Sequence, residues 1–206
     1  MWIKICGITN PEDALAAVEA GADAVGFIFV PSSPRVVTRD KVSQILALLP
    51  SAIQTVGVVA NERPEFLESL LRVCPLQTLQ FHGEESPEEV FSLKGQVKLI
   101  KAIRVQNPKD IEQIPDYEGV DAILLDARQP GQEGAASRPF EWDLVSRAKS
   151  FGIPLIVAGG LNPQNVGDLL AKVHPFGVDV SSGVEAAPGR KDPDLIRAFI
   201  ASAKQR

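Results

Sequence analysis

The sequence is poor in the residues that usually bind metals, since its 206 residues include only two cysteines and two histidines. Cys6 and Cys74 are far apart in the chain and form no metal-ligand spacing such as C-x-x-C. In a reducing compartment both are expected to be free thiols. The sequence therefore predicts no metal site.

Long apolar runs and an excess of basic charge are also absent. No apolar run is long enough to span a bilayer, and the N-terminus lacks the basic and apolar regions of a signal peptide. Because 26 acidic residues outnumber 21 basic ones, the net charge of −5 argues against a nucleic-acid partner, which needs a basic face. We therefore expect a cytoplasmic protein that binds neither membranes nor nucleic acids.

No Ser/Gly-rich linker and no run of charge divides the chain. Its length fits one domain, and 45% hydrophobic with 23% charged residues is typical of a globular protein with a sizeable core. We expect one domain that covers residues 1–206.

The chain does contain a regular alternation of strand-like and helix-like segments. Apolar and β-branched residues predict eight strands, at 2–6, 23–29, 54–59, 77–81, 97–103 and 121–125 and in the stretches that begin at 153 and 177. Helical segments follow them, with start signals at Asn10-Pro11, Thr38, Pro64, Ser86-Pro87, Asn107-Pro108, Asn162-Pro163 and Asp192-Pro193 and a further helix over 140–149.

This alternation indicates the α/β class with a parallel sheet. The sheet could be open and doubly wound, or it could close into a (β/α)₈ barrel. Eight units of about 26 residues favour the barrel. The G-x-G-x-x-G of a dinucleotide-binding sheet is also absent after the first strand. We predict a single (β/α)₈ TIM barrel.

Small residues follow the last two predicted strands, as Gly159-Gly160 and as Ser181-Ser182-Gly183. Glycine lets a ligand approach the backbone N–H groups, and two such turns side by side can direct several donors at one anion. In a barrel, the loops after strands seven and eight form the usual phosphate site. The ordinary alternative is that Gly159 and Gly160 merely form a tight βα turn. Two small-residue turns on consecutive strands favour phosphate binding instead.

Five reactive or polar residues lie at or just after predicted strand ends, where barrels hold their catalytic groups. They are Cys6, Arg35, His82, Asp126 and Asp179. Each has an ordinary alternative: a buried thiol is often a small core residue, an arginine is usually solvated, and a histidine can bond a neighbouring loop. Asp126 follows a buried apolar strand, so it is either paired or placed as an acid or base.

Six segments gain meaning when they are read together. They are Lys4-Ile5-Cys6-Gly7-Ile8-Thr9, Ser33-Pro34-Arg35, Gln80-Phe81-His82-Gly83, Leu124-Leu125-Asp126, Ala158-Gly159-Gly160-Leu161-Asn162-Pro163 with Asn165-Val166, and Val178-Asp179-Val180-Ser181-Ser182-Gly183-Val184-Glu185. In this order, from one end of the chain to the other, they resemble the phosphoribosylanthranilate isomerase family.

The resemblance implies the (β/α)₈ fold, no cofactor and one step of tryptophan biosynthesis, in the monofunctional form. That step is the Amadori rearrangement of N-(5-phosphoribosyl)anthranilate to 1-(2-carboxyphenylamino)-1-deoxyribulose 5-phosphate. The expected partner is therefore a small phosphorylated substrate. The oligomeric state is expected to be either a monomer or a homodimer.

The resemblance also implies roles for the candidate residues. Asp126 would be the acid that protonates the ring oxygen, and Cys6 the base that removes the proton from C2′. Arg35 would meet the anthranilate carboxylate through a charge-assisted pair. His82 and Asp179 are supporting substrate-binding candidates whose roles stay unseparated.

One loop departs from the family pattern. After the strand-six aspartate the family usually has a Gly-Gly-Thr/Ser-Gly run, whereas this chain has a longer polar stretch from Gly131 to Ser137. Because this connection exceeds the usual βα loop length, we expect a mobile lid.

Two other functions remain as alternatives. One is another phosphate-binding barrel of sugar-phosphate metabolism. An indole-glycerol-phosphate synthase would need a catalytic lysine at a strand end, whereas Lys4 lies inside the first strand, and two histidines are too few for a metal-dependent epimerase. The other is a non-catalytic barrel that binds a phosphorylated ligand, against which the placement of Cys6 and Asp126 argues.

Overall fold

A computed structural model of the protein describes residues 1–127 and 142–205. The stretch of residues 131–137, for which the sequence predicts a lid, lies outside the described residues. In the part of the chain that is described, no helix is long and apolar enough to cross a membrane.

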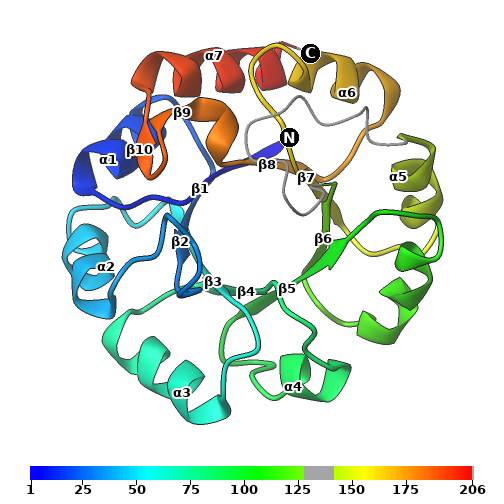
Figure 1. Ribbon diagram of the computed structural model, residues 1–206, viewed down its shortest axis with the longest axis horizontal. Coiled ribbons are helices and arrows are strands. Elements are labelled where there is room, and N and C mark those ends of the chain that lie inside the picture. The colour runs from blue at the N-terminus through cyan, green and yellow to red at the C-terminus, as the bar shows by residue number, and fades with distance from the viewer. Residues whose placement is uncertain (128–141, 206) are drawn as a thin grey trace.

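Eight parallel strands pair in chain order and close into a barrel, which forms the inner ring of Figure 1. They are β1 (Trp2–Cys6), β2 (Ala24–Ile28), β3 (Gln54–Val59), β4 (Thr78–Phe81), β5 (Lys98–Arg104), β6 (Ala122–Asp126), β7 (Leu155–Ala158) and β8 (Gly177–Val180). The first strand pairs with both β2 and β8, so the sheet has no free edge. The predicted (β/α)₈ barrel is confirmed.

Helices surround the strands as the outer ring of Figure 1. They are α1 (Pro11–Glu19), α2 (Arg39–Leu46), α3 (Pro64–Val73), α4 (Pro87–Phe91), the 3₁₀ helix η1 (Asp110–Tyr117), α5 (Trp142–Lys149), α6 (Val166–Lys172) and α7 (Pro193–Lys204). Strands β1 and β3 have the predicted bounds, helix α3 begins at the predicted Pro64, and the predicted bounds of β2, β4, β5 and β6 differ from the structure by at most one residue at each end.

Side-chain caps explain where several helices begin. The Asn10 side chain accepts from the Asp13 backbone N–H at 2.8 Å, and Asp192 accepts from two backbone N–H groups at the start of α7. At α4, Ser86 and Glu89 each accept from the other's backbone N–H, which is the predicted capping box. These local bonds satisfy N–H groups that have no partner within the helix.

Two helix predictions need correction. Helix α6 begins at Val166 rather than at Asn162-Pro163, because the Asn162 side chain accepts from the N–H groups of Gln164 and Asn165 and forms a turn first. The helix predicted from Asn107-Pro108 is the 3₁₀ helix η1, which contains Pro115. Proline lacks the backbone N–H that an α-helix would use there.

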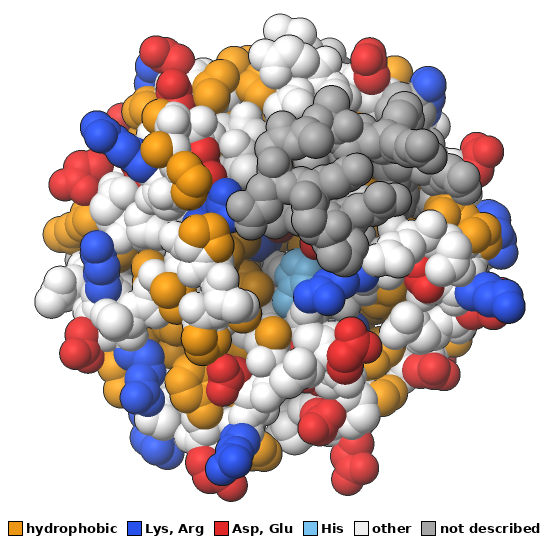
Figure 2. Space-filling view, viewed as in Figure 1, with side chains coloured by type: hydrophobic (Ala, Val, Ile, Leu, Met, Phe, Trp, Pro, Cys, Tyr) orange, Lys and Arg blue, Asp and Glu red, His pale blue; other side chains and the backbone are white. Residues whose placement is uncertain are grey.

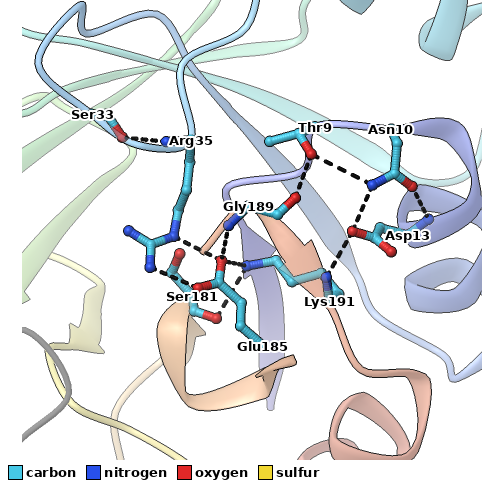
Figure 3. Close-up of polar contacts among 9 residues, drawn as sticks. All are labelled: Thr9, Asn10, Asp13, Ser33, Arg35, Ser181, Glu185, Gly189 and Lys191. Carbon is cyan, nitrogen blue, oxygen red and sulfur yellow. Dashed lines mark hydrogen bonds and ion pairs between the residues drawn. The ribbon is translucent and has the colours of Figure 1, made fainter. Parts of the chain in front are cut away.

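A short hairpin after β8 was not predicted from the sequence. A 3₁₀ turn, η2 (Ser182–Val184), leads into the antiparallel strands β9 (Glu185–Ala187) and β10 (Arg190–Lys191). These strands are too short to show an alternating pattern. The hairpin matters for the site, because it brings Glu185 and Lys191 beside the first two βα loops (Figure 3).

The core has two parts. The larger part lies between the barrel and its helices and includes Phe27, Phe81 and Phe199. The smaller part fills the barrel interior with Ile100, Ala102, Ala122, Leu124, Ile156 and Ala158. Alternate strand residues share a face, and the strand register places Lys4, Gln80 and Asp179 on this inner face, where all three are buried.

Candidate active site

A cavity of about 530 Å³ opens at the carboxyl ends of the strands. Nine of the ten residues predicted for the site line it: Cys6, Arg35, His82, Asp126, Gly159, Gly160, Asp179, Ser181 and Ser182. Figure 2 shows the barrel from the end viewed in Figure 1, hollowed near its centre, with histidine and basic side chains at the hollow. Side chains from distant parts of the sequence therefore converge on one mouth of the barrel.

The tenth predicted residue, Gly183, does not line the cavity and instead packs against the turn after β7. A Cβ atom at this position would lie 1.8 Å from the Leu161 carbonyl oxygen. Only glycine fits there, so this residue lets the turns after β7 and β8 approach each other closely.

The two glycines of the first predicted phosphate turn have positive φ angles, 91° at Gly159 and 68° at Gly160. The Asn165 side chain donates to the Gly160 carbonyl at 2.9 Å and holds the turn against the start of α6. Across from it, the hydroxyl of Ser181 is buried without a hydrogen-bond partner among the described residues. These turns therefore place small residues and a hydroxyl at one end of the cavity.

Cys6 lies at the end of β1 in the wall of the cavity, and the whole residue is 5% exposed. Burial raises the pKa of this thiol, and so does the carboxylate of Asp179, whereas the positive charges of Lys4 and Lys191 act in the opposite direction. Burial has the largest effect, so the pKa of Cys6 lies above that of an ordinary thiol, and the nearby charged side chains adjust it in both directions.

His82 connects a buried amide to Asp126. Its Nε2 is 3.2 Å from Asp126 Oδ2, and its Nδ1 is 3.0 Å from Gln80 Nε2. When the amide donates to Nδ1, the imidazole proton lies on Nε2 and faces the carboxylate. His82 and Asp126 can therefore share a proton inside the cavity.

Below His82, a second buried network fixes the loop after β4. Glu85 accepts from the backbone N–H groups of Asn61 and Gly83 and pairs with Lys101 at 2.7 Å. Lys101 also donates to the Gly83 carbonyl at 2.7 Å. Because Gly83 follows His82 directly, these bonds hold the backbone that positions the imidazole.

Arg35 is held at the cavity by Glu185, as Figure 3 shows. Its Nε and Nη2 atoms donate to the two carboxylate oxygens at 2.7 and 2.6 Å. Such a bidentate pair fixes the plane of the guanidinium group. Sequence reasoning assigned Arg35 to the substrate, and the structure adds that a buried carboxylate orients it.

Lys191 connects the same carboxylate to the turn after β8 (Figure 3). Its Nζ donates to Glu185 Oε1 at 2.9 Å and to the Ser181 carbonyl at 3.0 Å. Its backbone N–H donates to Asp13 at the start of α1. Glu185 and Lys191 thus join three βα loops around one wall of the cavity.

Sequence reasoning missed Lys4, Gln80, Glu185 and Lys191 as parts of the site. Alternation along β1 was a usable signal for Lys4, because residues two apart in a strand share a face and Cys6 was already a candidate. No local pattern marked Lys191, which reaches the site only through the hairpin. Within the part of the chain that is described, no three His, Cys, Asp or Glu side chains gather as metal ligands.

Comparisons with known proteins find relatives over nearly the whole chain. The family model described as N-(5'phosphoribosyl)anthranilate (PRA) isomerase matches residues 3–202. The N-(5'-phosphoribosyl)anthranilate isomerase of Geobacter sulfurreducens is 49% identical over 202 residues, 98% of each chain. That of Trichlorobacter lovleyi is 45% identical over 203 residues, again 98% of each.

Solved structures are similar as well. The phosphoribosyl anthranilate isomerase of Thermotoga maritima superposes with a TM-score of 0.95 at 43% identity over the whole of both chains. A second isomerase structure, in complex with reduced 1-(o-carboxyphenylamino)-1-deoxyribulose 5-phosphate, has a TM-score of 0.90 at 42% identity over the whole of both chains.

We expect Glu185→Gln to destabilise the protein in a pH-dependent way. Burial raises the pKa of the Glu185 carboxyl, but its bonds to Arg35 and Lys191 outweigh burial and lower this pKa below its ordinary value. The ion pairs therefore contribute fully above the ordinary glutamate pKa of about 4.3 and are lost as the pH falls through the lower folded-state pKa. Above that range the variant should be less stable by about 1–3 kcal/mol.

Thermal and urea unfolding of parent and variant across pH would measure this difference. The two proteins should become equally stable at the acid end, where the parent carboxyl is protonated. A stability difference that stays constant over the whole pH range would contradict the assignment.

Proposed function

Since this chain belongs to the N-(5'-phosphoribosyl)anthranilate isomerase family, we propose that its cavity binds the phosphorylated aminoaldose, with Cys6 and Asp126 as the base and the acid of the isomerisation. The protein is an isomerase of tryptophan biosynthesis. The observation that carries the residue assignment is that both side chains line one cavity whose end is built by the turns after β7 and β8.

Asp126 is the proton donor in this proposal. The sugar ring opens only when its oxygen is protonated as the bond to C1′ breaks, and the nitrogen lone pair then forms an imine. Asp126 lies at the end of β6, with His82 at 3.2 Å to share or replace its proton. A positioned acid of this kind contributes about 10²–10⁴-fold to a rate.

Cys6 is the base for the second step. Removal of the C2′ proton from the protonated imine gives an enolamine, which becomes the ketone when C1′ gains a proton and the C2′ hydroxyl loses one. The proton from C2′ passes to the Cys6 sulfur, so this step needs the thiolate. Cys6 belongs to β1 and Asp126 to β6, so the substrate lies between them across the barrel mouth.

The remaining groups suit the two ends of the substrate. Arg35, in the loop after β2, offers a planar cation for the anthranilate carboxylate, already oriented by Glu185. Gly159, Gly160, Ser181 and Ser182, in the turns after β7 and β8, line the cavity and offer backbone donors for the phosphate. Asp179 and His82 lie between these anchors in the cavity wall and are proposed to contact the sugar.

Cys6→Ala and Asp126→Asn should each lower kcat by at least about 10²-fold, because each removes a proton-transfer group. Loss of substrate fluorescence would report turnover, and binding of a reduced product analogue would show that the site is intact. Cys74→Ala is the matched control, since this second buried thiol donates to the Arg39 carbonyl away from the cavity. Near-parent kcat in either site variant would remove that residue from the mechanism.

Arg35→Lys should raise KM by about 10–100-fold, because lysine keeps the charge but loses the planar fork that a carboxylate and Glu185 both use. Steady-state kinetics would measure this effect. Arg39→Lys is the control, since Arg39 lies on α2, contacts Phe66 and Ser69, and does not line the cavity. Unchanged KM in Arg35→Ala would show that the carboxylate binds elsewhere.

Gly160→Val should weaken binding of the reduced product analogue by at least about tenfold, since a side chain would push the phosphate from the backbone donors. Because Gly160 has a positive φ, valine there also strains the backbone. A control variant must therefore introduce the same strain at a position away from the phosphate. Gly152→Val does so, because Gly152 has φ 78° with open space around its Cβ position. Equal calorimetric affinity in both variants would argue against this phosphate site.

A further inference from the structure

Lys4 is a fully buried lysine on the inner face of the barrel. It precedes Cys6 by two residues in β1, so both side chains lie on the same face of the strand. A lysine is rarely buried without a partner of opposite charge. Its place beside the proposed base therefore requires an explanation that packing alone does not give.

The partner of Lys4 is Asp179 on the neighbouring strand β8. The distance from Lys4 Nζ to Asp179 Oδ2 is 3.2 Å, and the strand register pairs the two residues directly. The second carboxylate oxygen, Oδ1, is buried without a hydrogen-bond partner among the described residues. Asp179 lines the cavity, whereas Lys4 lies behind it.

The Lys4 ammonium group also lies close to the Cys6 sulfur. A Cβ atom placed on Gly26 of β2 would be 2.8 Å from Cys6 Sγ and 3.2 Å from Lys4 Nζ. Both atoms thus converge on the same small space, which exists because residue 26 is glycine. Lys4 stays protonated there: burial opposes the charge, but Asp179 and Cys6 raise the pKa of the ammonium group.

The charged groups around Cys6 have opposing effects on its thiolate. Burial has the largest effect and raises the pKa of the thiol, as does Asp179 on β8, whereas Lys4 on the same strand and Lys191 on β10 lower this pKa and favour the thiolate. The adjacent residue of β2 is Gly26, which carries no charge. A buried thiolate needs a counter-charge, and Lys4 is the cation that pairs with the Asp179 carboxylate and lies close to the Cys6 thiol.

We propose that Lys4 is a positioning residue for the general base, whose ammonium group is shared between Asp179 and Cys6 and supports the Cys6 thiolate. The inference rests on the proposed role of Cys6. In the resting site Lys4 neutralises Asp179. When Cys6 is deprotonated, the same ammonium group balances the sulfur charge, so the barrel interior never holds two uncompensated anions.

Lys101 provides the structural comparison. It is also a buried lysine, 2% exposed, and its Nζ bonds Glu85 and the Gly83 carbonyl. It lies on the outer face of β5 and over the ring of Tyr117, not beside Cys6. Loss of Lys101 should therefore lower stability as loss of any buried ion-pair partner does, with no effect on the Cys6 thiol.

The test measures the alkylation rate of Cys6 by iodoacetamide as a function of pH, with mass spectrometry to identify the modified residue. A Cys74→Ala background removes the other thiol. Because the thiolate is the reactive form, the midpoint of the rate profile reports the Cys6 titration. In Lys4→Met the midpoint should move to higher pH by about 1–3 units. In Lys101→Met it should stay at the parent value.

Asp179→Asn provides a test of opposite sign that leaves Lys4 in place. With the carboxylate charge removed, the ammonium group acts on the thiol alone, so the midpoint should move to lower pH. An unchanged midpoint in folded Lys4→Met would overturn the proposal. If that variant does not fold, an unchanged or higher midpoint in Asp179→Asn would overturn it.

Alkylation needs no substrate, so its result is separate from the isomerase assay. If Cys6→Ala kept near-parent turnover, the proposed role of Cys6 as the base would fail. The inference that Lys4 supports this base would then fail as well, whatever the alkylation profile. If Cys6→Ala were inactive and the Lys4→Met midpoint were unchanged, only the role of Lys4 would fail.

Discussion

The pairing of β1 with β8 is the constraint on which the rest of the structure depends. It closes the barrel, and it sets Lys4 directly beside Asp179 although 175 positions in the numbering separate them. Closure brings the ends of all eight strands to one mouth, where loops from every part of the chain can contribute side chains. Without it, Cys6 and Asp126 would lie at distant points of an open sheet.

Buried ions then give the mouth of the barrel its shape. Glu185 holds Arg35 and Lys191, and Glu85 holds Lys101, so each carboxylate ties together loops that the strands alone do not order. A buried ion pair is weak evidence for stability, since removal from water offsets much of the attraction. Their location instead favours a role in orientation, because both networks lie directly behind side chains that line the cavity.

Much of the fold could be predicted because it depends on local patterns. Short apolar, β-branched runs and helix caps such as Asn10, Ser86 and Asp192 are properties of a few neighbouring residues, and the structure confirms them. The helix start at Asn162 was wrong because an Asn side chain can close a turn as readily as it caps a helix. The β9–β10 hairpin was missed because strands of three and two residues carry no periodic signal.

The same division applies to the site. By itself, the sequence determined the barrel, the two small-residue turns and which reactive side chains stand at strand ends, because each follows from a strand and the residues after it. Only the tertiary structure decided that Lys4 faces Cys6, that Glu185 orients Arg35 and that Gly183 packs under the Leu161 carbonyl. Those relations join residues that are close only after the sheet has closed and the hairpin has folded back, and no local pattern encodes a contact of that kind.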